Sequence, residues 1–130
     1  MIQLENTIIV YKSISGNVKN FISKLPIESF EIDNDNIYDY NHNGKFLLIV
    51  PTYDDFMMED VFDFMEDNHE QCFGIIGSGN NNFGELYIFT AKNLSKKYDI
   101  PIVYDFENNG NKKDVENIKS VIKELNNNKE

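Results

Sequence analysis

Short apolar runs alternate with helical patterns along the chain, and this alternation limits the possible folds more than any other feature. Apolar runs predict four strands, at Thr7–Tyr11 and at residues 46–50, 73–76 and 100–104, and the alternating segment 28–32 predicts a fifth, a short edge strand. Apolar residues at helical spacing predict helices at residues 17–25, 86–98 and 114–125, and a short helix or lid at residues 57–67. Strands separated by helices form a parallel sheet covered by helices on both faces, so the sequence predicts an α/β protein.

The number of strands narrows this class further. Five strands within 130 residues suit a single domain over residues 1–130, a three-layer sandwich with the strand order 2-1-3-4-5. This is the flavodoxin-like arrangement, in which ligands bind beyond the carboxyl ends of the strands. The polar segment 33–43 is expected to be a loop, and residues 126–130 are expected to form a frayed tail.

The loop after the first predicted strand, residues 13–17, has the composition of a phosphate-binding turn. Its sequence is Ser-Ile-Ser-Gly-Asn, and a predicted helix follows it. Backbone N–H groups, the hydroxyls of Ser13 and Ser15 and the start of the helix can all face an anion there. The loop contains no Lys or Arg, which excludes a strict P-loop. Taken alone, this loop could also be an ordinary helix N-cap without a ligand.

Two further loops suit a flat, aromatic ligand. The third loop, residues 77–84, has the sequence Gly-Ser-Gly-Asn-Asn-Asn-Phe-Gly, which offers backbone amides for a ligand's edge and Phe83 for its face. The second loop, residues 51–55, contributes the hydroxyl of Thr52 and the ring of Tyr53. The third loop alone could also be a mobile turn that Phe83 anchors to the core. One phosphate loop and two such loops on a doubly wound sheet together indicate flavin mononucleotide (FMN).

Charge and composition exclude several other functions. The net charge of −10 argues against a nucleic-acid partner and against an anionic membrane. No signal-like N-terminus or long apolar run is present in the sequence, so a cytoplasmic protein is expected. The single cysteine, Cys72, cannot form an internal disulfide and is expected to be a buried apolar side chain. His42 and His69 are expected at the surface, and no residues have zinc-site spacing.

These loops, and most of the chain around them, resemble the NrdI family, small flavodoxin-like proteins that serve class Ib ribonucleotide reductase. The most specific match is the run Gly-Ser-Gly-Asn-x-Asn-Phe-Gly at residues 77–84. Further matches lie at residues 11–18, 51–53, 97–98, 100–101, 106–107, 110 and 114–115. The resemblance implies FMN as the cofactor and the small, dimetal subunit of a class Ib ribonucleotide reductase as the partner.

The resemblance also implies a chemistry. A flavin or flavodoxin reductant of unknown identity would reduce the FMN, which would react with molecular oxygen. The superoxide formed would oxidise the partner's dimanganese centre, and this oxidation leads to the tyrosyl radical. Such a protein is a redox maturation factor in which no side chain acts as a general acid or base. A carbonyl near Gly79 and Asn80 would turn toward or away from flavin N5.

Carried over by position, the resemblance assigns cofactor contacts to all three loops. The phosphate would bind to the first loop, and the isoalloxazine ring would contact the second and third. The expected cofactor-binding residues are Ser13, Ile14, Ser15, Gly16, Asn17, Val18, Thr52, Tyr53, Asp54, Gly79, Asn80, Phe83 and Gly84. The chain departs from the family at Asp54 and Asp55, where many members are glycine-rich. These carboxylates are either solvated turn residues or a source of negative potential near the ring.

Rival functions differ in what they require of the sequence. A response-regulator receiver shares the strand order, but it needs acidic residues after the first strand and an Asp after the third. This chain has Lys12 and Thr52 at those positions, which excludes a receiver. A general electron-transfer flavodoxin and an accessory module without flavin affinity remain open. The short, Asn-rich third loop favours a protein that lets oxygen reach the flavin.

Overall fold

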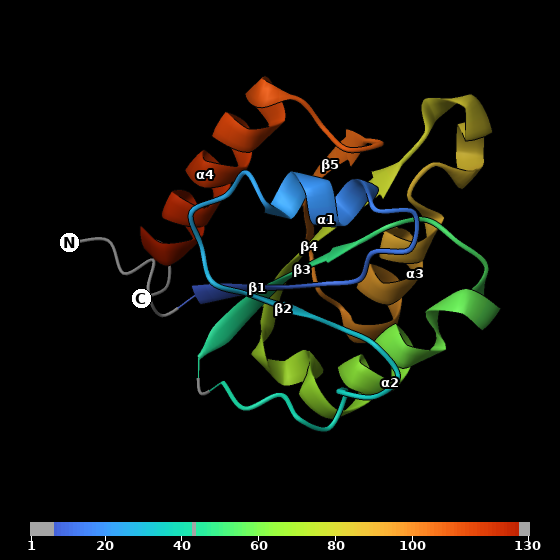
Figure 1. The fold of residues 1–130 in the computed structure, drawn as a ribbon, viewed down its shortest axis with the longest axis vertical. Helices are drawn as coiled ribbons and strands as arrows, with labels where there is room; N and C mark the ends of the chain where they lie inside the picture. The colour runs from blue at the N-terminus through green and yellow to red at the C-terminus, as the bar shows by residue number, and fades with distance from the viewer. Residues whose placement is uncertain (1–6, 43, 128–130) are drawn as a thin grey trace.

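A parallel sheet forms the centre of the computed structural model, which describes residues 7–42 and 44–127 (Figure 1). The strand order is β2-β1-β3-β4-β5, and each neighbouring pair is parallel. The predicted α/β class and the predicted strand order are therefore confirmed. The strands are β1 (Thr7–Tyr11), β2 (Ser29–Glu31), β3 (Lys45–Val50), β4 (Cys72–Gly79) and β5 (Ile102–Glu107).

Helices cover both faces of this sheet. One face carries α1 (Asn17–Ile22) and α4 (Lys112–Asn127), and the other carries α2 (Glu59–Asn68) and α3 (Phe89–Tyr98) (Figure 1). Short 3-10 helices join some of these elements, namely η2 (Asp55–Met58), η3 (His69–Gln71) and η4 (Asn81–Leu86). Within the described ranges, no helix is long and apolar enough to cross a membrane.

Side chains alternate along the strands and produce two apolar cores, one on each face of the sheet. In β1, Ile8 and Val10 pack with α2 and α3, whereas Ile9 and Tyr11 pack with α1 and α4. All four side chains are buried. Because both faces are covered, the central strands are continuous apolar runs, which is why the sequence pattern identified them.

Two strands extend further toward their carboxyl ends than the apolar pattern predicts. β4 continues through Ser78 and Gly79, which the sequence analysis assigned to the third loop, because Gly79 pairs with Glu107 of β5. β5 runs to Glu107 rather than ending at residue 104. Glycine and charged residues have low strand propensity, so pairing with the neighbouring strand, not local preference, extends both elements.

The helices also differ from their predicted bounds. α1 ends at Ile22 rather than at residue 25, because residues 24 and 25 form tighter, 3-10-type hydrogen bonds. The predicted helix 57–67 is divided into η2 and α2, and α3 begins only at Phe89. Leu86, predicted on the apolar face of α3, lies in η4 and is 58 % exposed. α4 continues to Asn127, so residues 126 and 127 are helical rather than frayed, and residues 128–130 lie outside the described chain.

α3 packs closely against the end of β4 at Gly77. A Cβ atom on Gly77 would lie 2.8 Å from Ile88 Cβ and 2.9 Å from Ala91 Cβ. Such distances are too short for packed carbon atoms, so only glycine fits between β4 and α3. The contact holds the start of α3 against the carboxyl end of the sheet.

A buried ion pair joins the end of β1 to α2. Lys12 Nζ lies 2.5 Å from Asp60 Oδ2, and the two side chains are 14 % and 2 % exposed. The other carboxylate oxygen of Asp60 is buried and has no hydrogen-bond partner in the described part of the chain. A buried charge that loses its partner is strongly destabilising, so the two residues depend on each other. The pair ties α2 to the strand that leads into the first loop.

We predict that Lys12→Met lowers the free energy of unfolding by about 3–5 kcal/mol, because Asp60 would stay buried without a counter-charge. The double variant Lys12→Met with Asp60→Leu should recover most of this loss. Lys19→Met is the matched control, because the ion pair of Lys19 with Glu31 is far more exposed than that of Lys12 with Asp60 and contributes about 1 kcal/mol or less. Urea unfolding measures all three, and wild-type stability of Lys12→Met would contradict the prediction.

Candidate functional site

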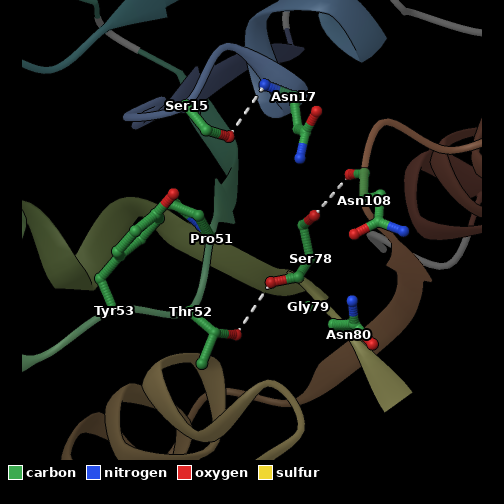
Figure 2. A pocket seen from close by; sticks show the side chains of 9 residues that line it. All are labelled: Ser15, Asn17, Pro51, Thr52, Tyr53, Ser78, Gly79, Asn80 and Asn108. Carbon is green, nitrogen blue, oxygen red and sulfur yellow. Dashed lines mark hydrogen bonds between the residues drawn. The ribbon is translucent and has the colours of Figure 1, made fainter. Parts of the chain in front are cut away.

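The carboxyl ends of β1, β3 and β4 meet at one edge of the sheet, where the loops after them form a cleft of about 150 Å³. The cleft is lined by Ser15, Asn17, Pro51, Thr52, Tyr53, Ser78, Gly79, Asn80 and Asn108 (Figure 2). Most of these residues belong to the three predicted loops. The structure therefore brings together the segments that the sequence analysis placed at separate strand ends.

Serine hydroxyls organise the first loop. Ser13 Oγ accepts a hydrogen bond from Lys19 N at 3.1 Å, and Ser15 Oγ accepts one from Asn17 N at 3.4 Å. A hydroxyl that accepts from an amide keeps its own hydrogen for another acceptor. Gly16 has a φ of +100°, a left-handed conformation that glycine adopts at little cost. The loop can therefore offer hydroxyl and amide donors to an anion.

Neutral groups, rather than cations, would have to hold an anion in this cleft. No lysine or arginine lines it among the described residues. The lysines that flank the first loop have other partners, because Lys12 pairs with Asp60 and Lys19 lies 3.3 Å from Glu31. This arrangement agrees with the sequence analysis, which excluded a strict P-loop.

A chain of hydrogen bonds joins the second loop, the end of β4 and the turn after β5. Thr52 Oγ1 donates to Ser78 O at 2.8 Å, and Ser78 Oγ donates to Asn108 O at 2.8 Å. Asn108 N donates to Gly79 O at 2.9 Å. Ser78 is buried, so these bonds satisfy polar groups that water does not reach. The three segments thus hold one another in place beside the cleft (Figure 2).

Gly79 lies where the second loop and the start of α3 approach β4. A Cβ atom on Gly79 would lie 3.1 Å from Ile88 N, 3.1 Å from Tyr87 Cδ1 and 3.2 Å from Thr52 Oγ1. Tyr87 is held in turn by its hydroxyl, which donates to Asp105 Oδ1 at 2.9 Å. Burial, together with this hydrogen bond and nearby carboxylates, raises the pKa of Tyr87 well above its usual value, so the hydroxyl stays a donor.

An apolar hollow of about 390 Å³ adjoins the cleft and shares Thr52 and Tyr53 with it. Its other lining residues are Asp54, Met57, Leu86 and Phe89. The backbone of Tyr53 is anchored where the two spaces meet: its N–H donates to Thr90 Oγ1 at 3.3 Å, and that hydroxyl donates to Tyr53 O at 3.2 Å. The combined site is polar at one end and apolar at the other.

The structure brings only some of the predicted binding residues to the cleft wall. The predicted residues that line it are Ser15, Asn17, Thr52, Tyr53, Gly79 and Asn80. Asp54 is exposed and lines the adjoining hollow. Ser13 does not line the cleft, and its hydroxyl accepts a hydrogen bond from Lys19 N. Both aspartates of the second loop, Asp54 and Asp55, are exposed to solvent.

Of the other predicted residues, those whose side chains the structure describes do not line the cleft. The side chain of Ile14 packs against the core below α2 and α3, and Val18 is buried in the opposite core. Gly16 is exposed at the N-cap of α1, and Gly84 lies in η4 with a φ of +59°. Phe83 is also part of η4, and its side chain lies outside what the structure describes. Contacts of these residues with a cofactor stay predictions.

Sequence analysis missed Asn108. Pro51 and Ser78 also line the cleft, but they lie inside segments that the sequence had already singled out. Asn108 follows β5, where no site was predicted. The available signal was the run Asn-Asn-Gly at residues 108–110, whose composition is typical of a turn at a strand end.

Histidine and cysteine lie away from the cleft. Cys72 is buried as predicted, and burial raises the pKa of its thiol to about 12. His69 stacks on Tyr98 with ring centroids 4.5 Å apart, and neither His42 nor His69 lines the cleft. Residues 7–42 and 44–127 contain no group of three or more His, Cys, Asp or Glu side chains that could hold a metal ion.

Known proteins are similar in sequence to this chain over nearly its whole length. A family model described as "NrdI Flavodoxin like" matches residues 9–120. Protein NrdI of Mesoplasma florum is 35 % identical over 127 residues, covering 91 % of this chain and 84 % of the relative. Protein NrdI of Wigglesworthia glossinidia brevipalpis is 32 % identical, with 90 % and 88 % covered.

A solved structure shares the fold. It is a short-chain flavodoxin associated with a bacterial microcompartment, and it superposes with a TM-score of 0.64 over 89 % of this chain and 93 % of that one. At 18 % sequence identity this likeness concerns the fold alone. The family match over residues 9–120 and the relatives that are 32–35 % identical lead to one conclusion: the chain belongs to the NrdI family of flavodoxin-like proteins, whose members bind FMN.

Proposed function

We propose that this protein binds FMN at the carboxyl end of its sheet and supplies superoxide to the small, dimetal subunit of a class Ib ribonucleotide reductase. Membership of the NrdI family links the chain to ribonucleotide reductase. The observation that carries the proposal is the joined site, with hydrogen-bond donors in the cleft and apolar walls in the hollow. The free cysteine supports a location in the reducing cytoplasm.

The first loop suits the phosphate of FMN. A Cβ atom on Gly16 would meet no other atom within 4 Å, so there is open space against the backbone of the loop. The hydroxyl of Ser15 and the side chain of Asn17 face the same cleft (Figure 2). Ser13 supports them by accepting from Lys19 N. Hydrogen bonds from such neutral donors to a charged group are stronger than those between neutral groups.

The second and third loops suit the flat ring. Tyr53 and Met57 offer an aromatic and a polarizable apolar surface at the hollow. Asn80 Oδ1 accepts from Asn82 N at 2.8 Å, which orients the carboxamide and leaves its NH₂ group as a donor for the ring's edge. The bond from Thr52 to Ser78 holds the two loops at a fixed separation.

When bound, FMN supplies the one-electron transfer that converts molecular oxygen into superoxide, with electrons drawn from an external flavin or flavodoxin reductant. The residues of this chain bind and orient the cofactor. The cleft is lined by hydroxyl, amide, glycine and proline residues, with no carboxylate, histidine or lysine among those described. Met57 and Leu86 border the hollow and are 42 % and 58 % exposed, which leaves the hollow accessible to a small molecule.

The exposed position of Asp54 and Asp55 supports the interpretation of both as solvated turn residues. Two unit charges about 4 Å apart interact by about 1 kcal/mol in water, and salt screens them further. We therefore expect these carboxylates to oppose reduction of the cofactor only weakly.

Stepwise anaerobic reduction of the FMN-loaded protein, followed by admission of air, tests the proposed chemistry. We expect rapid reoxidation and formation of superoxide, detected as cytochrome c reduction that superoxide dismutase suppresses. A partly reduced form that persists in air would instead support a general electron-transfer flavodoxin. A protein that takes up no added FMN would contradict the proposed cofactor site itself.

Ser15→Ala should weaken FMN binding about tenfold or more, because a hydrogen bond to a charged group contributes about 1.5–3 kcal/mol. Riboflavin lacks the phosphate, so its affinity should not change. Ser23→Ala is the matched control, because Ser23 is exposed and its hydroxyl donates to Asn20 O instead of facing the cleft. Quenching of flavin fluorescence measures each affinity. Equal weakening of FMN and riboflavin binding would remove Ser15 from the phosphate site.

Exposed apolar side chains beside the hollow suit contact with the partner subunit. Phe56, Met57 and Leu86 are 81 %, 42 % and 58 % exposed. Phe56 also lines a neighbouring groove with Phe62 and the acidic side chain of Glu59. Exposed apolar surface with a charged rim is typical of protein interfaces. A partner that docks here would lie directly beside the site at which oxygen is reduced.

Phe56→Ser should therefore weaken binding of the reductase small subunit about tenfold or more and leave FMN affinity unchanged. Tyr38→Ser is the matched control, because Tyr38 is an aromatic residue with a similar exposure of 79 % that lines neither the cleft nor the hollow. Surface plasmon resonance with the immobilised small subunit measures both variants. An equal loss of affinity for the small subunit in the two variants would argue against a docking site at Phe56.

A further inference from the structure

The turn after β5, residues 107–110, reaches the cleft through Asn108. This residue lines the cleft although it lies outside the three predicted loops (Figure 2). Its φ is +53°, in the left-handed region that Asn adopts more readily than most residues. The turn is closed by Gly110 N, which donates to Glu107 O at 2.9 Å. The residue type at position 108 thus suits the backbone that this turn requires.

The left-handed conformation turns both backbone groups of Asn108 toward β4. Its N–H donates to Gly79 O at 2.9 Å, and its carbonyl accepts from Ser78 Oγ at 2.8 Å. Gly79 and Glu107 are the last paired residues of β4 and β5, so both bonds lie just beyond the sheet. We call these two hydrogen bonds the Asn108 latch, because they fasten the end of β4 to the turn after β5.

The latch fixes the direction of the Gly79 carbonyl. A carbonyl oxygen only accepts hydrogen bonds, and this one is engaged by Asn108 N. Gly79 lines the cleft, and glycine allows wide backbone rotation, so a released carbonyl could turn into the cleft. Reduction of a flavin adds N–H groups to its ring. A released carbonyl would therefore bind reduced FMN more strongly than oxidised FMN.

We propose that Asn108 is a positioning residue of the FMN site, which holds the Gly79 carbonyl against β5 and so prevents it from favouring the reduced cofactor. This inference rests on the proposed FMN site. It gives the turn after β5 a part in setting the redox potential, and Asn108 exerts this effect through Gly79 and Ser78 rather than through a bond of its own to the cofactor.

Three variants separate the latch from the side chain of Asn108. Ser78→Ala removes one of the two bonds and deletes a single buried oxygen. Asn108→Val opposes the left-handed backbone, because a β-branched residue is strongly disfavoured there. Asn108→Gly is the matched control: it removes the side chain that lines the cleft but keeps the N–H, the carbonyl and the positive φ.

The readout is the ratio of the dissociation constants of oxidised and reduced FMN. We expect Ser78→Ala and Asn108→Val to raise this ratio about fivefold, the effect of one hydrogen bond. For a two-electron couple, that change raises the midpoint potential by about 20 mV. Asn108→Gly should stay within about twofold of the wild-type ratio. In the protein without FMN, hydrogen exchange at the Asn108 amide should be faster in Ser78→Ala than in the wild type.

An unchanged ratio in both Ser78→Ala and Asn108→Val would overturn the proposal, even if amide exchange is faster. A change of this ratio in Asn108→Gly as large as in Ser78→Ala would also overturn the proposal, because the side chain of Asn108 would then act directly on the cofactor. Wild-type protein that binds no FMN would contradict the proposed function and this role together. Normal FMN binding by the wild type with no shift in the variants would contradict only the role of Asn108.

Discussion

The parallel pairing of β1, β3 and β4 is the constraint on which the rest of this structure depends. Tyr11 pairs with Ile49, and Ile49 pairs with Ile76, so the three strands reach the same edge of the sheet. The loop that follows each strand therefore begins at that edge, although the three loops are far apart in the sequence. The two apolar cores maintain the register, because a slip by one residue would exchange the side chains of the two faces.

Two kinds of polar contact stabilise the loops on this frame. The ion pair of Lys12 and Asp60 ties α2 to the end of β1, and it leaves one buried carboxylate oxygen of Asp60 without a partner among the described residues. The bonds among Thr52, Ser78 and Asn108 are neutral and join three segments beside the cleft. Because these bonds form within the chain, they help to order the cleft before a ligand binds, which lowers the entropic cost of binding.

In the proposed function, cofactor, oxygen and partner meet at one edge of the sheet. We propose that the polar cleft holds the phosphate, that the apolar hollow receives the ring, and that the exposed side chains of Phe56, Met57 and Leu86 face the partner. Most of these contacts come from loops, whose side chains do not have to fill a core. The role inferred for Asn108 adds a further control to this proposal, because the turn after β5 fastens the strand end that carries Gly79.

The sequence by itself determined the α/β class, the order of strands and helices along the chain, and the three main loops. The spacing of apolar residues indicates burial on one or both faces of an element, and runs of serine, glycine and asparagine indicate turns. The local sequence pattern was therefore sufficient to identify these elements. Only the tertiary structure decided the extension of β4 through Gly79, the ion pair of Lys12 and Asp60, and the place of Asn108 in the site. These features depend on contacts between distant residues, among them Ser78 with Asn108, 30 positions apart, and Lys12 with Asp60, 48 positions apart, which become neighbours only when the sheet forms.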